Sequence, residues 1–361
     1  MNKEIFKTKL LEYMKLEAPS RFEKPVAQKL IQNLHNTNFE ISYDNFGSLI
    51  LHKKSHSINA PKIMIAAHMD EVGYLVRDIT STGHILVEPI GGIWPTVVIG
   101  TKAILINSLN ERFEGVFGHT SIHILEPEKR TKAINNKELY VDFGFFSKEN
   151  ALENKVEIGN VIYLTAPTIN FHNQNLIAGK AMDNRAGVCV LEYIAHKVNQ
   201  LNLDVDLFLV ATVQEEVGTR GAKTSVQLIN PDIAIALDTT SSHDTPDVIA
   251  GTTKLGLGAA LRIMDGAMMA DPKLTNYLCH IGEKFNIKHY KFISMGGGTD
   301  ASALQYSKGG AATITISLPQ RYLHSPIGVC DINDLIAAGD LLTEFIKNMN
   351  LEIYDRIIKY K

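Results

Sequence analysis

The stretch AGKAMDNRAGVCVLEYIA, residues 178–195, decides the fold because it joins a buried helical pattern to an acidic residue. Apolar residues here and in the next turn recur at spacings of three and four, which predicts one buried helix face. Asp183 precedes this pattern at the place of an N-cap, where the helix dipole favours a negative charge. Taken alone, Asp183 would be interpreted as a helix cap. Acidic and imidazole residues elsewhere in the chain suggest a second interpretation.

The composition is that of an ordinary globular protein. The chain has 361 residues, 45% of them apolar and 21% charged, which is enough for one large domain and a smaller one. The net charge of -3 predicts no basic surface for nucleic acid or for a membrane. The N-terminal segment interleaves charged with apolar residues, unlike a signal peptide, and the three cysteines form no CxxC pair. We therefore expect a cytoplasmic protein with buried, reduced thiols.

Apolar runs that end near acidic or imidazole residues alternate with helical patterns. Continuous apolar runs are typical of central strands that are covered on both faces. The alternation predicts an α/β fold, in which a mixed central sheet is flanked by helices. A capping-box spacing between Ser20 and Glu23 predicts the start of one of these helices. The runs are Ile63–Ala67 before His68 and Asp70, Leu207–Val213 before Glu215 and Glu216, Ile233–Leu237 before Asp238, and Ala312–Leu318 before His324.

Residues 71–166 have a different pattern. Short apolar runs are separated by glycines, and a long helical stripe is missing. This pattern predicts a small inserted all-β domain of barrel-like form. The α/β domain would then consist of residues 1–70 and 167–361.

The polar residues at the ends of the predicted strands should lie near one another. Ligands of open α/β sheets bind at the carboxyl ends of the strands, and Asp183 and His324 can reach the same edge. Two histidines and three carboxylates suit a pair of zinc, cobalt or manganese ions that share one bridging carboxylate. Each residue alone has a plainer explanation, such as a buried core histidine or a solvated acidic pair. Their joint occurrence favours a metal site.

Three acidic residues have further expected roles. Asp70 is placed to accept the second imidazole N–H of His68 and to orient the ring. The adjacent Glu215 and Glu216 should point in different directions. One of them would bind metal, and the other would act as a general base on the attacking water.

Five motifs, in this order, resemble the metal-site motifs of the M42 family of metallo-aminopeptidases. That family includes glutamyl aminopeptidases and tetrahedral, dodecameric aminopeptidases. The resemblance runs from about Ser20 to Phe345. The motifs are AAHMDEVG at 66–73, AGKAMDNRAG at 178–187, VQEEVGTRGA at 213–222, IALDTT at 235–240 and YLHSPIGV at 322–329.

The resemblance implies two divalent metal ions per subunit. One ion would be held by His68, Asp183 and Asp238. The other would be held by Asp183, Glu216 and His324, so that Asp183 bridges the two.

The resemblance also implies roles for the neighbouring residues. Glu215 would be the general base, and Asp70 would orient His68. The bond between Asp183 and Asn184 is often a cis peptide in this family. The insertion would mediate dimerisation within a homo-oligomer of twelve subunits.

A glycine-rich segment and several cations are candidates for substrate contact. The segment from Met295 to Ala301 lacks the lysine of a phosphate loop, and its resemblance to the family's GGGTDA stretch places Gly297 and Gly298 beside the substrate. Arg321, with Arg220 and Lys254, is a candidate contact for an acidic substrate side chain.

The sequence therefore predicts a dimetal aminopeptidase that removes N-terminal residues from peptides with a free N-terminus. One alternative is a dimetal deacylase or carboxypeptidase on the same scaffold, because substrate type depends on loops. The other is a non-catalytic oligomeric binding protein.

Overall fold

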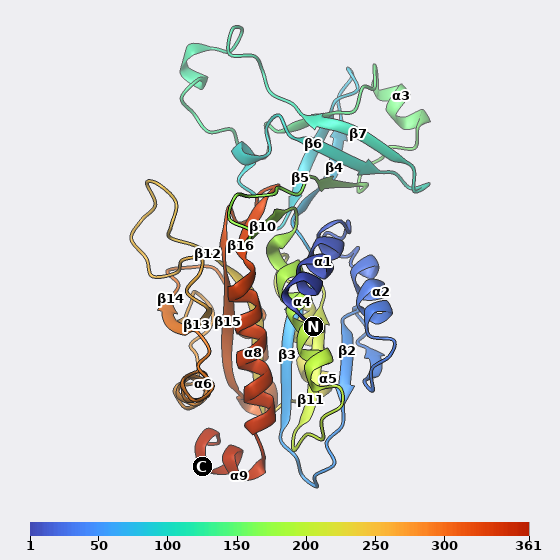
Figure 1. The fold of residues 1–361 in the computed structure, drawn as a ribbon. Helices are drawn as coiled ribbons and strands as arrows, with labels where there is room; N and C mark the ends of the chain where they lie inside the picture. Colours follow the sequence, from blue (N-terminus) through green and yellow to red (C-terminus); the bar gives the residue numbers. More distant parts are fainter. Residues whose placement is uncertain (361) are drawn as a thin grey trace.

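The computed structural model describes residues 1–360 as a large mixed sheet with helices and a small closed barrel beyond one end of that sheet (Figure 1). Eight strands of the sheet follow one another as β1-β2-β11-β3-β12-β15-β13-β14, and β16 pairs with both β15 and β10. The bounds are β1 Glu40–Tyr43, β2 Leu49–Lys53, β3 Lys62–His68, β10 Leu176–Gly179, β11 Asp206–Thr212, β12 Ile233–Ser241, β13 Ala259–Met264, β14 His289–Ile293, β15 Ala312–Arg321 and β16 Gly328–Asp331.

The central strands β11, β3, β12 and β15 are parallel neighbours, and β2 and β13 flank them in the antiparallel direction. The run Ile63–Ala67 is buried throughout, as expected of a strand that is covered on both faces. This mixed sheet confirms the predicted α/β fold class.

Helices pack against the central strands. The helix α4 contacts β3, β12, α1 and α8, while α5 and α7 contact each other and lie against strands of the same sheet. The bounds are α1 Lys3–Met14, α2 Lys24–Asn33, α3 Lys148–Glu153, α4 Met182–Val198, α5 Arg220–Ile229, α6 Pro272–Lys284, α7 Ala301–Leu304, α8 Ile332–Asn348 and α9 Leu351–Ile353, with single turns at Pro95–Val97, Pro127–Lys129, Ser307–Gly309 and Tyr354–Ile358. Among the described residues, no helix combines the length and the apolar composition needed to cross a bilayer.

The inserted barrel closes in the strand order β4-β5-β8-β7-β6-β9. The barrel is inserted in the sequence between β3 and β10. It has a buried hydrophobic cluster of its own around Tyr74, Phe117 and Val141. The prediction of a small all-β insertion is therefore confirmed, while the domain boundaries at residues 71 and 166 stay a prediction. The strands are β4 Gly73–Ile79, β5 Ile85–Ile90, β6 Lys102–Ile106, β7 Arg112–Phe117, β8 Tyr140–Asp142 and β9 Val161–Leu164.

The start of α2 differs from the prediction. The helix begins at Lys24, and Glu23 makes no side-chain cap hydrogen bond. Ser20 Oγ instead donates a hydrogen bond of 2.6 Å to Asp70, and Glu23 accepts one of 3.0 Å from the backbone N–H of Gln214. The capping-box prediction is wrong because both side chains bond to residues at the edge of the sheet.

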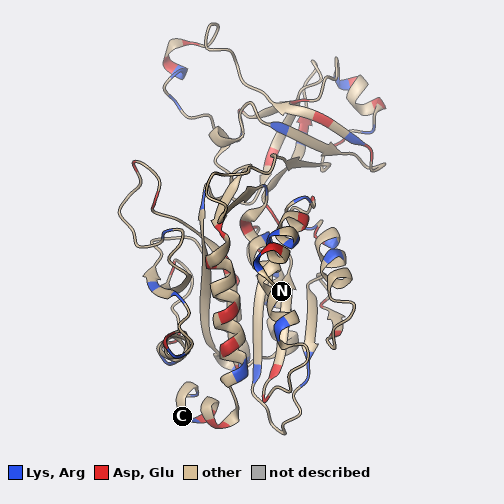
Figure 2. Ribbon diagram, in the orientation of Figure 1, with Lys and Arg blue, Asp and Glu red and all other residues tan. Residues whose placement is uncertain are grey.

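Charges of both signs are interspersed over the sheet unit and the barrel (Figure 2). This distribution agrees with the small net charge of -3.

Candidate metal centre

The predicted ligands meet at the carboxyl edge of the central parallel strands. His68 is the last residue of β3, Glu216 lies in the turn after β11, and His324 follows β15. Asp183 reaches the same place from the start of α4. The site therefore joins segments that are far apart in the sequence.

Asp238 is placed differently from the prediction. The predicted strand ended at Leu237, but β12 continues to Ser241 because residues 239–241 pair with β15 in parallel register. Asp238 is therefore held inside a strand, which fixes a side chain more firmly than a loop does.

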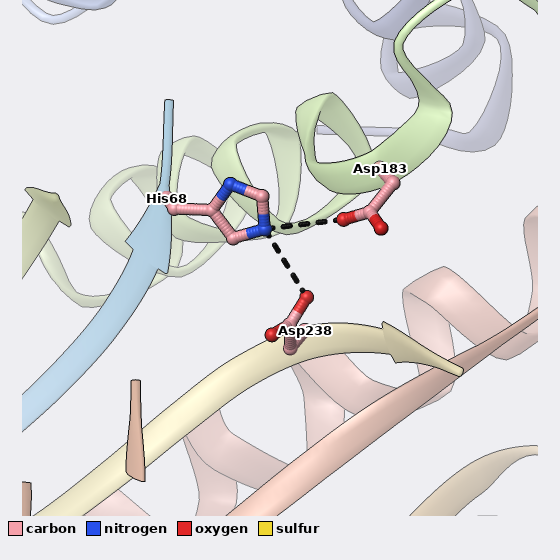
Figure 3. Close-up of side chains that lie close together, drawn as sticks. All are labelled: His68, Asp183 and Asp238. Atoms are coloured by element: carbon pink, nitrogen blue, oxygen red, sulfur yellow. Dashed lines mark ion pairs between the residues drawn. The ribbon is translucent and has the colours of Figure 1, made fainter. Parts of the chain in front are cut away.

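The first group of ligands surrounds one imidazole nitrogen. His68 Nε2 lies 3.1 Å from Asp183 Oδ1 and 3.4 Å from Asp238 Oδ1 (Figure 3). The three side chains come from β3, α4 and β12 and point toward one another. We call this group the first triad.

The second triad uses the other oxygen of Asp183. His324 Nε2 lies 3.3 Å from Asp183 Oδ2 and 3.4 Å from Glu216 Oε2. His324 Nδ1 makes a hydrogen bond of 2.6 Å with the carbonyl oxygen of Gly92 in the barrel unit, which orients the ring. Asp183 thus stands between the two triads and presents one carboxylate oxygen to each.

The donor set fits two divalent cations. Ligands bound at about 2.0–2.1 Å to a tetrahedral zinc ion lie roughly 3.3 Å from one another, and the four distances in the triads run from 3.1 to 3.4 Å. Asp183 Oδ1 and Glu216 Oε1 are buried without a hydrogen-bond partner among the described residues. Buried carboxylate oxygens without a donor require compensation, which a cation would supply.

The electrostatics of the triads also favour cations. Burial disfavours the charged form of His324, but hydrogen bonds with Asp183 and Glu216 outweigh burial and raise its pKa to about 11. Burial likewise opposes charge on His68, and attraction by Asp238 raises its pKa well above the usual range. The surrounding carboxylates therefore create a strongly negative potential at both imidazoles.

Asp183 does not cap α4, contrary to the interpretation of that residue alone. Asp183 and Asn184 have non-helical backbone angles, and the peptide bond between them is cis, as the resemblance implied. Asn184 Oδ1 accepts a hydrogen bond of 2.9 Å from the backbone N–H of Gly187, and its amide donates to Leu237 O at 2.8 Å. Because Asn184 takes the capping role, both oxygens of Asp183 are free to face the histidines.

Asp70 contacts both His68 and the backbone after β11. Its Oδ1 lies 3.4 Å from His68 Nδ1, but that nitrogen is closer to the carbonyl oxygen of Asp70, at 3.1 Å. The carboxylate accepts hydrogen bonds from the backbone N–H groups of Glu215 at 3.0 Å and Glu216 at 3.1 Å. Asp70 therefore holds the chain after β11 as well as the histidine.

Glu215 lies beside the triads and belongs to neither of them. It lines a cavity of about 870 Å³ that opens over the ligands. Burial raises its pKa well above that of an ordinary carboxyl, and this effect exceeds the opposing attraction of His68. A carboxyl group with a raised pKa, next to an accessible cavity, is suited to general-base chemistry.

The glycine-rich segment forms one wall of the same cavity. Gly297 and Gly298 both line it, and their contact with substrate stays a prediction. Gly297 has φ of +75°, a conformation that disfavours other residues, and its carbonyl accepts a hydrogen bond of 3.1 Å from Gly266. The backbone thus approaches the cavity where a side chain would narrow it.

The predicted cation Arg321 is placed elsewhere. It forms a bidentate pair with Asp244 at 2.9 and 2.8 Å and is absent from the cavity lining. Arg262 and Lys291 line the cavity instead. Arg262 is bound to Asp265 at 3.1 Å, whereas Lys291 donates to the neutral amide oxygen of Asn276 at 3.2 Å.

Neither of these cations is among the substrate contacts expected from the sequence. Arg262 interrupts the apolar run Ala259–Ile263, and it is buried. A charged residue within an apolar run is unusual, so the sequence does carry a signal for Arg262. Lys291 gave no signal, because an isolated lysine in a short strand is usually solvated.

Known proteins resemble this chain along most of its length. The M42 glutamyl aminopeptidase family model matches residues 47–341. A glutamyl aminopeptidase of Lactococcus lactis subsp. cremoris is 34% identical over 350 residues, which cover 96% of this chain and 97% of that protein.

Solved structures have the same fold. Aminopeptidase APDkam598 of the archaeon Desulfurococcus kamchatkensis matches with a TM-score of 0.92 and 34% identity, over 99% of each chain. The TET1 peptidase of Pyrococcus horikoshii, which can assemble into a tetrahedron or a large octahedral shell, matches with a TM-score of 0.85 and 27% identity, over 95% of this chain and 100% of that one. The chain therefore belongs to the M42 family of glutamyl aminopeptidases and is a hydrolase that acts on peptide bonds.

Proposed function

We propose that this protein is a dimetal-dependent aminopeptidase that removes N-terminal residues from peptides. The observation that carries the proposal is the position of Asp183, whose two carboxylate oxygens face His68 at 3.1 Å and His324 at 3.3 Å. One carboxylate between two triads is the arrangement that a pair of bridged ions requires.

The ions themselves would be zinc, cobalt or manganese, since histidine and carboxylate ligands accept all three. Bound ions of this kind lower the pKa of a coordinated water and polarise the scissile carbonyl. His68, Asp183 and Asp238 would hold one ion, and Asp183, Glu216 and His324 would hold the other.

Glu215 is proposed as the general base. Its carboxylate takes a proton from the attacking water and then transfers it to the leaving amine. Its place in the cavity lining, outside both triads, supports this assignment. Asp70 keeps His68 and the backbone of Glu215 in fixed positions.

The substrate's free α-amino group would bind beside the triads. An ammonium group there is attracted by the surrounding carboxylates. A neutral N-acetyl group lacks this attraction, and its acyl group needs extra space beyond the N-terminus of the substrate. Selectivity for a free N-terminus follows.

We further propose a preference for an acidic N-terminal residue. Lys291 is a cavity-lining cation whose hydrogen-bond partner is the neutral Asn276, so its charge remains available to a substrate carboxylate. Arg262 is already neutralised by Asp265. The glutamyl aminopeptidase of Lactococcus lactis, 34% identical to this chain, is consistent with this preference.

The barrel unit is proposed as the surface for homo-oligomerisation, first into a dimer and then into a larger shell of twelve subunits. Large apolar side chains are exposed on it, among them Ile124 and Phe146, each 80% exposed. The tetrahedral or octahedral assembly of the TET1 peptidase supports the proposal, and the molar mass in solution, measured by light scattering, would test it.

Paired substrates test the proposed reaction. Aminoacyl anilides with free and with N-acetylated amines should be offered to protein loaded with zinc, cobalt or manganese. Cleavage of only the free amines, lost with chelator and restored by metal, is expected. Cleavage of the acetylated series would indicate the alternative deacylase instead.

A further inference from the structure

Three consecutive backbone N–H groups after β11 are bound by two buried carboxylates. Asp70 accepts from Glu215 and Glu216 at 3.0 and 3.1 Å, and Glu23 accepts from Gln214 at 3.0 Å. Glu23 is buried, with 5% of its surface exposed, and it lies 191 residues before Gln214 in the sequence. Glu23 has no part in the chemistry described above.

The residue that Glu23 holds has an unusual backbone conformation. Gln214 has φ of +57°, in the left-handed region that is unfavourable for residues other than glycine. This conformation turns the chain out of β11, directly before Glu215 and Glu216. A hydrogen bond to the Gln214 N–H supports the turn at its least favourable residue.

Glu23 is itself fixed in place. Its Oε1 also accepts a hydrogen bond of 2.8 Å from the backbone N–H of Arg21. The loop before α2 is tied to the end of β3 by bonds of 2.8 Å from Ala18 N to Glu71 and 2.6 Å from Ser20 to Asp70. The carboxylate of Glu23 therefore belongs to a hydrogen-bonded network that joins the loop before α2 to the ends of β3 and β11.

We propose that Glu23 is a positioning residue for Glu215. By anchoring the N–H of Gln214, Glu23 sets the direction in which the next side chain enters the cavity. Misplacement of a reacting group by about 1 Å can cost on the order of 100-fold in rate. This proposal rests on the proposed role of Glu215, but it concerns a hydrogen bond that can be measured without activity.

Two substitutions at one position separate positioning from folding. Glu23→Ala removes the acceptor, whereas Glu23→Gln keeps one carbonyl oxygen that can accept from both Arg21 and Gln214. Asp271→Ala is the control, because it removes a half-buried carboxylate from the N-cap of α6, where Asp271 accepts a hydrogen bond of 2.8 Å from the backbone N–H of Leu274. The control lies outside the catalytic machinery.

Kinetics of the metal-loaded enzymes give the first test. Glu23→Ala should lower kcat by roughly 10- to 100-fold with a smaller change in KM and with unchanged metal content. Glu23→Gln should restore kcat to within about threefold, and Asp271→Ala should lower only the thermal stability. An unchanged kcat in Glu23→Ala, or a loss of its metal, would overturn the proposal.

Hydrogen exchange of the peptide around residues 213–218 gives the second test. Amides bonded to buried carboxylates are protected, so Glu23→Ala should speed exchange there by about tenfold or more, while Glu23→Gln should not. If wild-type protein proved inactive on every peptide, this result would still stand, and the proposed function alone would fail. Unchanged exchange in Glu23→Ala would refute the anchoring role.

Discussion

The carboxylate of Asp70 accepts a hydrogen bond of 3.1 Å from the backbone N–H of Glu216. The same carboxylate lies 3.4 Å from the imidazole of His68. His68 belongs to the first triad and Glu216 to the second. The buried side chain of Asp70 therefore contacts one residue of each triad. Asp183 connects the triads directly, because it belongs to both of them.

This connection predicts the effect of Asp70→Asn. The amide keeps the size of the side chain but replaces one acceptor by a donor, which would face a backbone N–H of Glu215 or Glu216. We expect metal affinity to fall about 10- to 100-fold, as for other residues that support metal ligands. Calorimetric titration of metal-free protein measures the change. An affinity equal to that of the wild type would show that the support is unnecessary.

Glu215→Gln should separate metal binding from turnover. The neutral amide cannot accept the proton from water, so kcat should fall by roughly 100- to 10,000-fold. The metal content should stay at the wild-type value, because Glu215 belongs to neither triad. Glu216→Gln is the matched comparison and should lose metal as well. Near-normal kcat in Glu215→Gln would disprove the assignment of the base.

The sequence predicted the arrangement of the site better than its details. Strand ends at His68 and after β11 followed from apolar runs, since burial patterns extend over many residues. The capping by Asn184 could not be predicted, because it depends on the local path of the backbone around Asp183. Gln214 and its partner Glu23 were missed since long-range hydrogen bonds have no sequence period.

The choice of cavity cation shows the same limit. Arg321 was one candidate contact for an acidic substrate side chain, and the structure pairs it with Asp244, 77 residues away. Neither the partner nor the distance between them could be read from the sequence. Lys291 lines the cavity because β14 pairs with β13, and this pairing could not be predicted from the sequence.

Lys291→Glu should reverse the proposed preference for acidic residues. The substitution replaces an attractive charge by a repulsive one, so kcat/KM for a glutamyl anilide should fall by tenfold or more, while that for a lysyl anilide should rise. Lys291→Gln should give intermediate values. Equal kcat/KM ratios for wild type and Lys291→Glu would show that the preferred residue is selected elsewhere.

The pair of Arg321 and Asp244 should affect stability rather than specificity. Hydrogen bonds from Arg321 lower the pKa of Asp244 to about 2, from a usual value of 3.8. Because the folded pKa is the lower one, the pair stabilises the protein above about pH 4 and loses this effect as the pH falls toward 2. Arg321→Gln should cost ~1 kcal/mol or less at pH 7 by urea unfolding, and less still at pH 3. A changed substrate preference in this variant would contradict its position outside the cavity.

Removal of metal should also destabilise the fold. Ions that bind only the folded state raise its stability, by about 2.7 kcal/mol when the free ion is at 100 times its Kd. The carboxylates of the triads would then lie close together without compensating charge. We expect a lower Tm after chelation and its recovery with zinc, cobalt or manganese. An unchanged Tm would show that the triads are stable without ions.

The number of ions bound by Asp183→Ala tests whether this carboxylate bridges two metal ions. Chelator-treated proteins would be reloaded with one metal, and the ions per chain would be counted by native mass spectrometry. We expect two ions for the wild type, one each for His68→Ala and His324→Ala, and none held tightly by Asp183→Ala, since Asp183 belongs to both triads. Two tightly bound ions in Asp183→Ala, or a single ion in the wild type, would contradict the shared carboxylate.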